Sequence, residues 1–240
     1  MTAYTKNEPH TIQEMFDSIA KRYDLTNAIL SFGLHHYWNQ KLVQALRQPE
    51  SHTLIDLCSG TGDIAIRYLH SIPSPCSAYL VDFSAGMLAY AKSKIHPSHM
   101  SRHKLEFIEA DVQSLPLPSN LAECTSMAYG IRNVKEPVVC LREAFRVLKA
   151  GGKIGILELT RPRYSFLRLG HKLYLNTCLP LFGKWLTDNQ KAYEYLRQSI
   201  NTFIAPEELK ELLENVGFTS IQCKPLLGGV ATLFIGQKPL

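Results

Sequence analysis

Short apolar runs alternate with amphipathic stretches between residues 53 and 159. The runs are rich in apolar and β-branched residues, and the segments between them carry apolar residues at helical spacing. Strands that alternate with helices favour a parallel sheet joined by crossover helices. The pattern therefore predicts an α/β fold, with strands at 53–58, 77–82, 104–109, 122–128 and 153–159.

Residues with strong capping or breaking preferences set the expected helix boundaries. Ser84 suits the N-cap of a helix that runs toward Pro97. Pro137 suits the first turn of another helix, which we expect to end at Gly151 and Gly152.

The pattern changes near the C-terminus. Residues 193–203 and 206–217 have helical spacing, and Gly217 is a helix stop. Apolar runs at 218–224 and 231–236 follow, separated by a short turn. We interpret these runs as a hairpin that adds antiparallel strands to the otherwise parallel sheet.

Two further regions flank or interrupt the alternation. Residues 11–46 read as helical, and residues 161–188 hold five aromatic residues, seven leucines and five Lys/Arg against one acid. The second segment suits a lid or a membrane-interfacial helix, but also a subunit contact or an inserted helical pair. We interpret 1–240 as a single domain with a helical N-terminal cap at 1–50 and a helical lid or insert at 161–204.

The first predicted strand runs directly into a glycine turn that opens a helix. Gly60 and Gly62 allow a sharp turn and close approach of a ligand, because neither has a Cβ. The helix that follows presents free N–H groups at its start. Ligands of open α/β sheets bind at this edge, outside the carboxyl ends of the strands.

The identity of the ligand depends on Asp56, four residues before Gly60. The stretch from Gly60 to Ala65 fits the dinucleotide pattern, and Asp82 follows Gly62 at the offset of a ribose-binding acid. Asp56, however, would repel the phosphates of a dinucleotide, whereas S-adenosylmethionine is cationic and has no phosphate. The turn therefore resembles motif I of the class I methyltransferases, with an NAD-dependent dehydrogenase as the alternative.

Composition indicates which kinds of partner the protein binds and in which cellular compartment it works. The net charge of +5 is modest and no Lys/Arg-dense run is present, so we expect no nucleic-acid partner. The six cysteines include no C-x-x-C pair, which favours reduced, buried thiols over disulfides or zinc. The polar first residues predict no signal peptide and a cytoplasmic location. No apolar run approaches the ~20 residues of a membrane span.

Three longer motifs carry a more specific resemblance. They are Tyr23-Asp24-x-x-Asn27-x-x-Leu30-Ser31-x-x-x-His35-x-x-Trp38, Tyr129-Gly130-Ile131-Arg132-Asn133-Val134, and Arg146-Val147-Leu148-Lys149-Ala150-Gly151-Gly152-Lys153 through Glu158. Together they resemble the quinone-biosynthesis C-methyltransferases that act on demethylmenaquinol and, in some members, on a ubiquinol precursor. The resemblance runs from about residue 14 to the C-terminus.

This resemblance implies a fold, a donor and an acceptor. The fold would be the class I methyltransferase fold, Rossmann-like, with a mostly parallel sheet and a C-terminal antiparallel strand. The cofactor would be S-adenosyl-L-methionine, no metal would be needed, and the acceptor would be a polyprenyl quinol. Because such a quinol stays in the bilayer, the resemblance implies transient contact with the membrane surface; it leaves open a homodimer, a benzoquinol acceptor and a non-catalytic scaffold.

The same resemblance assigns candidate site residues. Arg132 and Asn133 would stabilise charge on a ring oxygen, and Tyr23 would relay a proton, with His35 ranked below them. The implied cofactor contacts are Gly60, Thr61 and Gly62 at the methionine end, Asp82 at the ribose, and Asp111 with Val112 at the adenine.

Overall fold

The computed structural model describes residues 9–48, 52–178 and 190–240. Seven strands form one sheet in the order β3-β2-β1-β4-β5-β7-β6. Strands β1 to β5 are parallel, and β7 runs antiparallel to both β5 and β6. The strands are β1 (Thr53–Leu57), β2 (Ser77–Asp82), β3 (Lys104–Glu109), β4 (Ala122–Ala128), β5 (Leu148–Leu159), β6 (Thr219–Leu226) and β7 (Ala231–Gln237). Both the predicted α/β class and the predicted terminal hairpin are confirmed.

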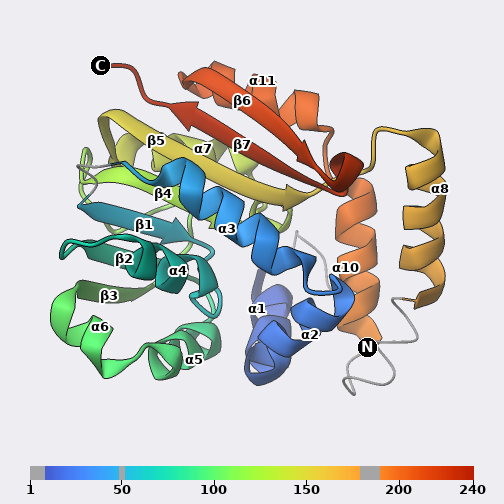
Figure 1. The fold of residues 1–240 in the computed structure, drawn as a ribbon, viewed down its shortest axis with the longest axis horizontal. Coiled ribbons are helices and arrows are strands. Elements are labelled where there is room, and N and C mark those ends of the chain that lie inside the picture. The colour runs from blue at the N-terminus through green and yellow to red at the C-terminus, as the bar shows by residue number, and fades with distance from the viewer. Residues whose placement is uncertain (1–8, 49–51, 179–189) are drawn as a thin grey trace.

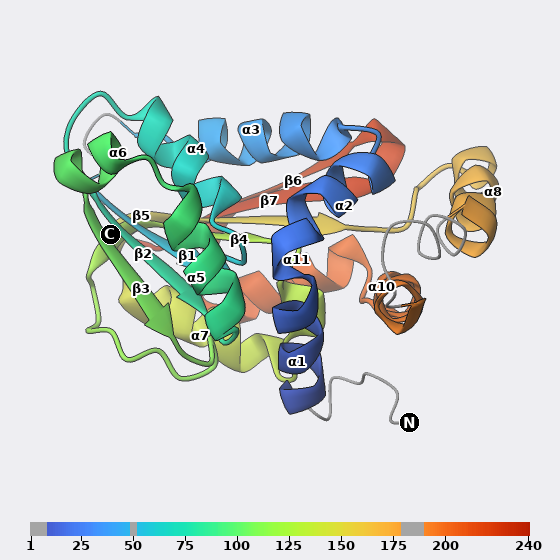
Figure 2. The ribbon, with the colours of Figure 1, turned by 90° about the horizontal axis from the view of Figure 1, so that it is seen from below.

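Helices cover both faces of this sheet (Figure 2). On one face α3 crosses β4, β5 and β7, and α4 and α5 lie against β1 to β3; α7 and α11 cover the other face. The helices are α1 (Pro9–Ile19), α2 (Tyr23–Leu30), α3 (Leu34–Leu46), α4 (Asp63–Ser71), α5 (Ala85–Lys94), α6 (Pro97–Arg102), α7 (Pro137–Val147), α8 (Ser165–Leu173), α10 (Gln190–Thr202) and α11 (Pro206–Val216). Short turns are η1 (Ala20–Arg22), η2 (Ile131–Asn133), the π-helical η3 (Tyr174–Cys178) and η4 (Leu227–Gly229).

The two-residue period of the strands divides their side chains between two cores. In β2, Ala78 and Leu80 pack with α3, α4 and α5, whereas Tyr79 and Val81 pack with α7 and α11. Because both faces are covered, all four of these side chains are buried. This double burial explains why the strands read as near-continuous apolar runs in the sequence.

One predicted boundary is wrong. Helix α7 ends at Val147 instead of at the two glycines, because Leu148 is already extended and pairs with Ala122 in the sheet. Leu148 is fully buried, so tertiary packing outweighs the local glycine signal. Gly151 and Gly152 therefore lie inside β5, where the register with β4 shifts.

Four helices gather beyond the carboxyl ends of the parallel strands (Figure 1). They are α1 and α2 from the N-terminal region, and α8 and α10 from the segment after β5. Part of the predicted lid, residues 179–189, lies outside the described residues. Among the helices that the structure describes, none is long and apolar enough to cross a bilayer. These four helices enclose the edge at which the sequence predicts a ligand.

Candidate active site at the carboxyl edge of the sheet

The glycine turn after β1 has the conformation that its sequence predicts. Gly60 and Gly62 have φ angles of 52° and 75°, which side chains rarely adopt. Gly62 also serves packing: an added Cβ would lie 3.1 Å from the side chain of Leu80 and 3.2 Å from that of Ala91. The N–H of Gly60 donates a hydrogen bond of 2.8 Å to Asp82 Oδ2, which ties the turn to the end of β2.

A first cavity, the strand-end pocket, has a volume of about 270 Å³. Its lining includes Gly60, Asp82, Asp111, Val112 and Asn133, at the ends of neighbouring strands. Asp82 Oδ1 accepts from the N–H of Ser84 (2.9 Å), so backbone donors fix both carboxylate oxygens. Burial raises the pKa of Asp82 to about 6.

Asp111 lies in a different setting on the same pocket. Its carboxylate is exposed and accepts from the side chain of Gln113 at 3.1 Å and 2.9 Å and from the N–H of Gln113 at 2.9 Å. Asp82 therefore lies in the buried part of the strand-end pocket, and Asp111 lies at its exposed rim.

A second cavity, the loop pocket, lies around the glycine turn and has a volume of about 240 Å³. Three carboxylates line it: Asp24, Asp56 and Asp63. Asp56 is 1% exposed; its Oδ1 accepts from Ser126 Oγ (2.6 Å), and its Oδ2 has no partner among the described residues. Burial raises the pKa of Asp56 to about 7. The loop pocket is thus an acidic site with an unsatisfied buried acceptor.

Cys58 directly follows β1 and lines both of these cavities. Burial, reinforced by the nearby carboxylates of Asp82 and Asp56, raises the pKa of its thiol well above the ordinary range. The thiol is therefore protonated at neutral pH.

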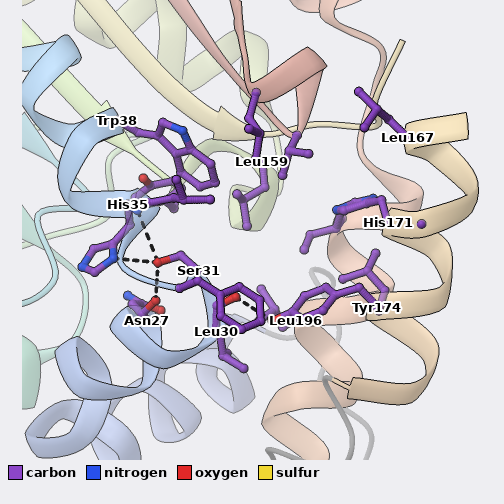
Figure 3. A pocket seen from close by; sticks show the side chains of 18 of the residues that line it. Asn27, Leu30, Ser31, His35, Trp38, Leu159, Leu167, His171, Tyr174 and Leu196 are labelled. Carbon is purple, nitrogen blue, oxygen red and sulfur yellow. Dashed lines mark hydrogen bonds between the residues drawn. The ribbon is translucent and has the colours of Figure 1, made fainter. Parts of the chain in front are cut away.

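A third cavity, the apolar pocket, has a volume of about 400 Å³ and lies between α2 and α3 on one side and α8 and α10 on the other (Figure 3). Trp38 and Leu30 face Leu167, His171 and Tyr174 across it. The OH of Tyr174 donates to the backbone oxygen of Leu30 (2.5 Å), which links the two walls. The size and the lining suit a mainly hydrophobic ligand.

Tyr23 and Tyr129 line all three cavities. The acidic loop pocket, the strand-end pocket and the apolar pocket therefore meet at these two side chains. Burial raises the pKa of both hydroxyl groups, so both are protonated at neutral pH. The OH of Tyr129 donates to Asn39 Oδ1 (2.9 Å), which fixes the ring between the cavities.

Arg132 lines the apolar pocket but is held from behind by Glu158. Its Nη1 donates to Glu158 Oε1 and to the backbone oxygen of Tyr129 (2.6 Å). Arg132 is 5% exposed and Glu158 is fully buried. Burial raises the pKa of Glu158, an effect that the guanidinium of Arg132 opposes. The Nε–H of Arg132 has no partner among the described residues.

Asn133 and His35 are also oriented by neighbours. Asn133 Oδ1 accepts from the OH of Tyr195 (3.0 Å) on α10. His35 Nδ1 lies 2.7 Å from the hydroxyl of Ser31, and burial lowers the pKa of His35 to about 4. His35 is therefore neutral and a weak base, in keeping with its lower rank among the candidates.

The structure brings nearly all the predicted site residues to these cavities. Tyr23, Gly60, Asp82, Asp111, Val112 and Asn133 line the strand-end pocket, Thr61 lines the loop pocket, and Arg132 lines the apolar pocket. Gly62 instead serves the packing of the turn. Sequence reasoning missed Tyr129 as a shared wall, and it missed Asp24 and Lys94 in the loop pocket, although Asp24 and Tyr129 lie inside the motifs.

Comparison with solved structures relates the fold to methyltransferases. A Thermotoga maritima protein described as an S-adenosylmethionine-dependent methyltransferase, possible histamine N-methyltransferase, aligns with a TM-score of 0.63 at 18% identity, covering 94% of this chain and 98% of that one. An S-adenosylmethionine-dependent methyltransferase from Aquifex aeolicus aligns with a TM-score of 0.63 at 16% identity, covering 92% and 97%. At these identities the likeness shows the fold, which is the predicted one.

Comparison of sequences gives the family. A demethylmenaquinone methyltransferase of Protochlamydia amoebophila is 54% identical over the whole of both chains. A relative of the same name from Chlamydia trachomatis serovar D is 45% identical over 97% of this chain and 98% of its own length. The model of the ubiE/COQ5 methyltransferase family matches residues 3–238. This chain therefore belongs to the ubiE/COQ5 methyltransferase family.

Proposed function

We propose that this enzyme transfers a methyl group from S-adenosyl-L-methionine to a ring carbon of demethylmenaquinol, giving menaquinol. The observation that carries the proposal is the junction at Tyr23 and Tyr129, where an acidic cavity and a strand-end cavity meet an apolar one. Such a junction suits a polar, cationic donor on one side and an apolar acceptor on the other. The names of the relatives supply the naphthoquinol as acceptor.

The donor set of the two polar cavities fits this cofactor. Asp56 Oδ2, a buried acceptor without a partner, matches an incoming ammonium group. Asp82 has its carboxylate held at the end of β2, where it can accept from ribose hydroxyls. We assign Asp111 and Val112 to the adenine, and Gly60 and Thr61 to the methionine end. The same acids disfavour the phosphates of the alternative dinucleotide.

We expect the affinity for S-adenosylmethionine to rise with pH between about pH 5 and pH 8. Asp56 has a pKa of about 7 in the free protein, so it is largely protonated at the acidic end of this range. A bound ammonium favours the carboxylate, so binding lowers this pKa and releases a proton. Calorimetry in two buffers of different ionisation enthalpy measures that release. Asp56→Asn should flatten the pH dependence, and an unchanged slope in this variant would contradict the assignment.

Once bound, the cofactor supplies an electrophilic methyl group on a sulfonium. The acceptor carbon becomes nucleophilic when a neighbouring ring hydroxyl loses its proton. The carbon then forms the C–CH₃ bond while the S–CH₃ bond breaks. Finally, the methylated carbon loses its own proton, which restores the aromatic ring. Arg132 provides a fixed positive charge beside the apolar pocket, and its unpartnered Nε–H can donate to the ring oxygen. Asn133 is oriented by Tyr195 to bond the same oxygen. Tyr23 relays the proton of the ring carbon: because its own hydroxyl is protonated, it accepts this proton as it passes its own to solvent.

Product analysis tests this function directly. Purified enzyme is incubated with S-adenosylmethionine and either reduced demethylmenaquinone or a reduced benzoquinone precursor, and the products are identified by mass spectrometry. We expect methylated naphthoquinol as the main product. Methylation of the benzoquinol alone would assign the other ring. No methylation of either ring by enzyme that binds the cofactor would favour a scaffold role.

We further propose that α8 contacts the membrane surface from the cytoplasmic side. Phe166, Leu169 and Leu173 are 73%, 71% and 62% exposed, and their spacing places them on one face of the helix. Arg168 and Lys172 are exposed on the same helix, and residues 159–178 contain no acid. Phe166 also lines the apolar pocket, as do Leu167 and His171 on another face of α8. A helix that is apolar outward and basic at its flank suits an anionic bilayer.

Replacing Leu169 and Leu173 together with Ser is expected to weaken binding to anionic vesicles and to lower kcat/KM for long-tailed quinol by about tenfold or more. Turnover of a short-tailed, soluble analogue should change little, because neither Leu169 nor Leu173 lines the apolar pocket. Sedimentation with vesicles at low and high salt, together with both assays, measures the effect.

Val139→Ser on α7 and Met100→Ser on α6 remove exposed apolar side chains from other elements and serve as controls. Equal loss with both substrates, or no binding of wild-type protein to vesicles at low salt, would leave α8 as a lid or a subunit contact.

A further inference from the structure

The loop pocket holds one cation among its acids. Asp24, Asp56 and Asp63 line it, and Lys94 is the only lysine or arginine among its described lining residues. These acids can attract the two positive groups of the proposed cofactor, its ammonium and its sulfonium. They would repel its third charged group, the α-carboxylate of the amino-acid end. That carboxylate needs a positive partner inside an otherwise anionic cavity.

Lys94 is held at the cavity by two contacts. It is the last residue of α5, and its Nζ lies 2.5 Å from Asp24 Oδ2 and 3.3 Å from Thr61 Oγ1. Thr61 Oγ1 in turn donates to Asp24 Oδ1 at 2.5 Å. An ammonium group carries three N–H donors, and these contacts use two of them. One N–H donor therefore remains for a ligand anion, on an ammonium group that Asp24 holds in an ion pair and that lies 5.8 Å from the centroid of the Tyr90 ring.

The other two acids of the loop pocket, Asp63 and Asp56, have hydrogen-bond partners other than Lys94. Asp63 accepts from Arg67 Nε (2.9 Å) and from Asn39 Nδ2 (2.7 Å). Asp56 is bound by Ser126 and does not contact Lys94 through any hydrogen bond in the described residues. Asp24 is thus the carboxylate that sets the position of Lys94, and it does so from α2, next to Tyr23.

We propose that Lys94 binds the α-carboxylate of the cofactor's amino-acid end and that Asp24 is the residue that positions Lys94 for this contact. The assignment rests on the proposed methyl donor. It makes the loop pocket selective for a zwitterionic amino-acid group, with the acids facing the ammonium and Lys94 facing the carboxylate. Because Asp24 belongs to α2, it also joins the cofactor end to the helix that carries Tyr23.

Two ligands that differ only in the carboxylate test this assignment. Calorimetry compares S-adenosylmethionine with decarboxylated S-adenosylmethionine in wild-type protein and in Lys94→Gln. We expect Lys94→Gln to weaken binding of the complete cofactor by about 10- to 100-fold and to leave the decarboxylated form nearly unchanged. The carboxylate and Lys94 then behave as one coupled pair.

Lys92→Gln, an exposed lysine in the last turn of the same helix, is the matched control and should bind both ligands as wild type does. Equal weakening of both ligands by Lys94→Gln would make Lys94 a structural tie between α5, the glycine turn and α2. Full retention of cofactor affinity would also overturn the assignment. Failure of wild-type protein to bind either ligand would instead contradict the proposed methyl donor.

Discussion

Replacing Asp82 with Asn is expected to weaken binding of S-adenosylmethionine by about 100-fold or more. The side chain of Asp82 has two tasks: it is the proposed acceptor for the ribose, and it holds the N–H groups of Gly60 and Ser84. In Asn one acceptor becomes an NH₂ group, which must face either a backbone N–H or a ribose hydroxyl. One hydrogen bond is lost outright, and the remaining ones are no longer made to a charged carboxylate, which together give the size of the expected effect.

The measurement is calorimetry with S-adenosylmethionine and with its demethylated product, accompanied by thermal unfolding of the same samples. Glu109→Gln is the control, because Glu109 is an exposed acid that ends β3 and pairs in register with Asp82. The control should keep wild-type affinity. An Asp82→Asn protein that binds the cofactor within a few-fold of wild type would remove Asp82 from the binding site.

Replacing Arg132 with Ala is expected to lower both stability and turnover. The substitution leaves the buried carboxylate of Glu158 without its cation, which costs about 3–5 kcal/mol of the free energy of unfolding. It also removes the positive charge beside the apolar pocket, which should lower kcat by about 10²–10³-fold. Urea unfolding and steady-state kinetics measure the two losses.

A double variant separates the two roles of Arg132. Replacing a buried ion pair by apolar residues of similar volume is often neutral for stability, so Arg132→Met with Glu158→Leu should recover most of the lost free energy of unfolding. Its kcat should stay low if Arg132 stabilises charge on the substrate, with cofactor affinity nearly unchanged. Recovery of both stability and kcat would show that the pair is purely structural.

The fold could be predicted because its signals are local and repeated. Each parallel strand is buried on both faces, so the runs around Ile55 and Leu80 are apolar throughout, and strand–helix alternation leaves few topologies. The end of α7 could not be predicted in the same way. The glycines at 151 and 152 are a local signal, whereas the pairing of Leu148 with Ala122 depends on the assembled sheet.

The site was predicted where a motif carries it and missed where distant segments meet. Asp82 and Gly60 lie 22 residues apart and fit one motif, so the sequence predicts that both contact the same ligand. Lys94 and Asp24 are 70 residues apart, and although Asp24 lies inside a motif, Lys94 lies in none. Their contact depends on how α2 and α5 meet at the edge of the sheet. The shared wall of Tyr23 and Tyr129 likewise exists only once α2 lies over the end of β4.

The protonated thiol of Cys58 has a consequence for the chemical durability of the enzyme. The oxidised form of the proposed substrate is an electrophile, and its unsubstituted ring carbon undergoes conjugate addition by thiolates. Cys58 lines two of the cavities that meet at the proposed methyl-transfer site, yet its raised pKa leaves almost no thiolate at neutral pH. Burial likewise raises the thiol pKa of Cys76, Cys140 and Cys223. These four thiols are therefore slow to be arylated by stray quinone.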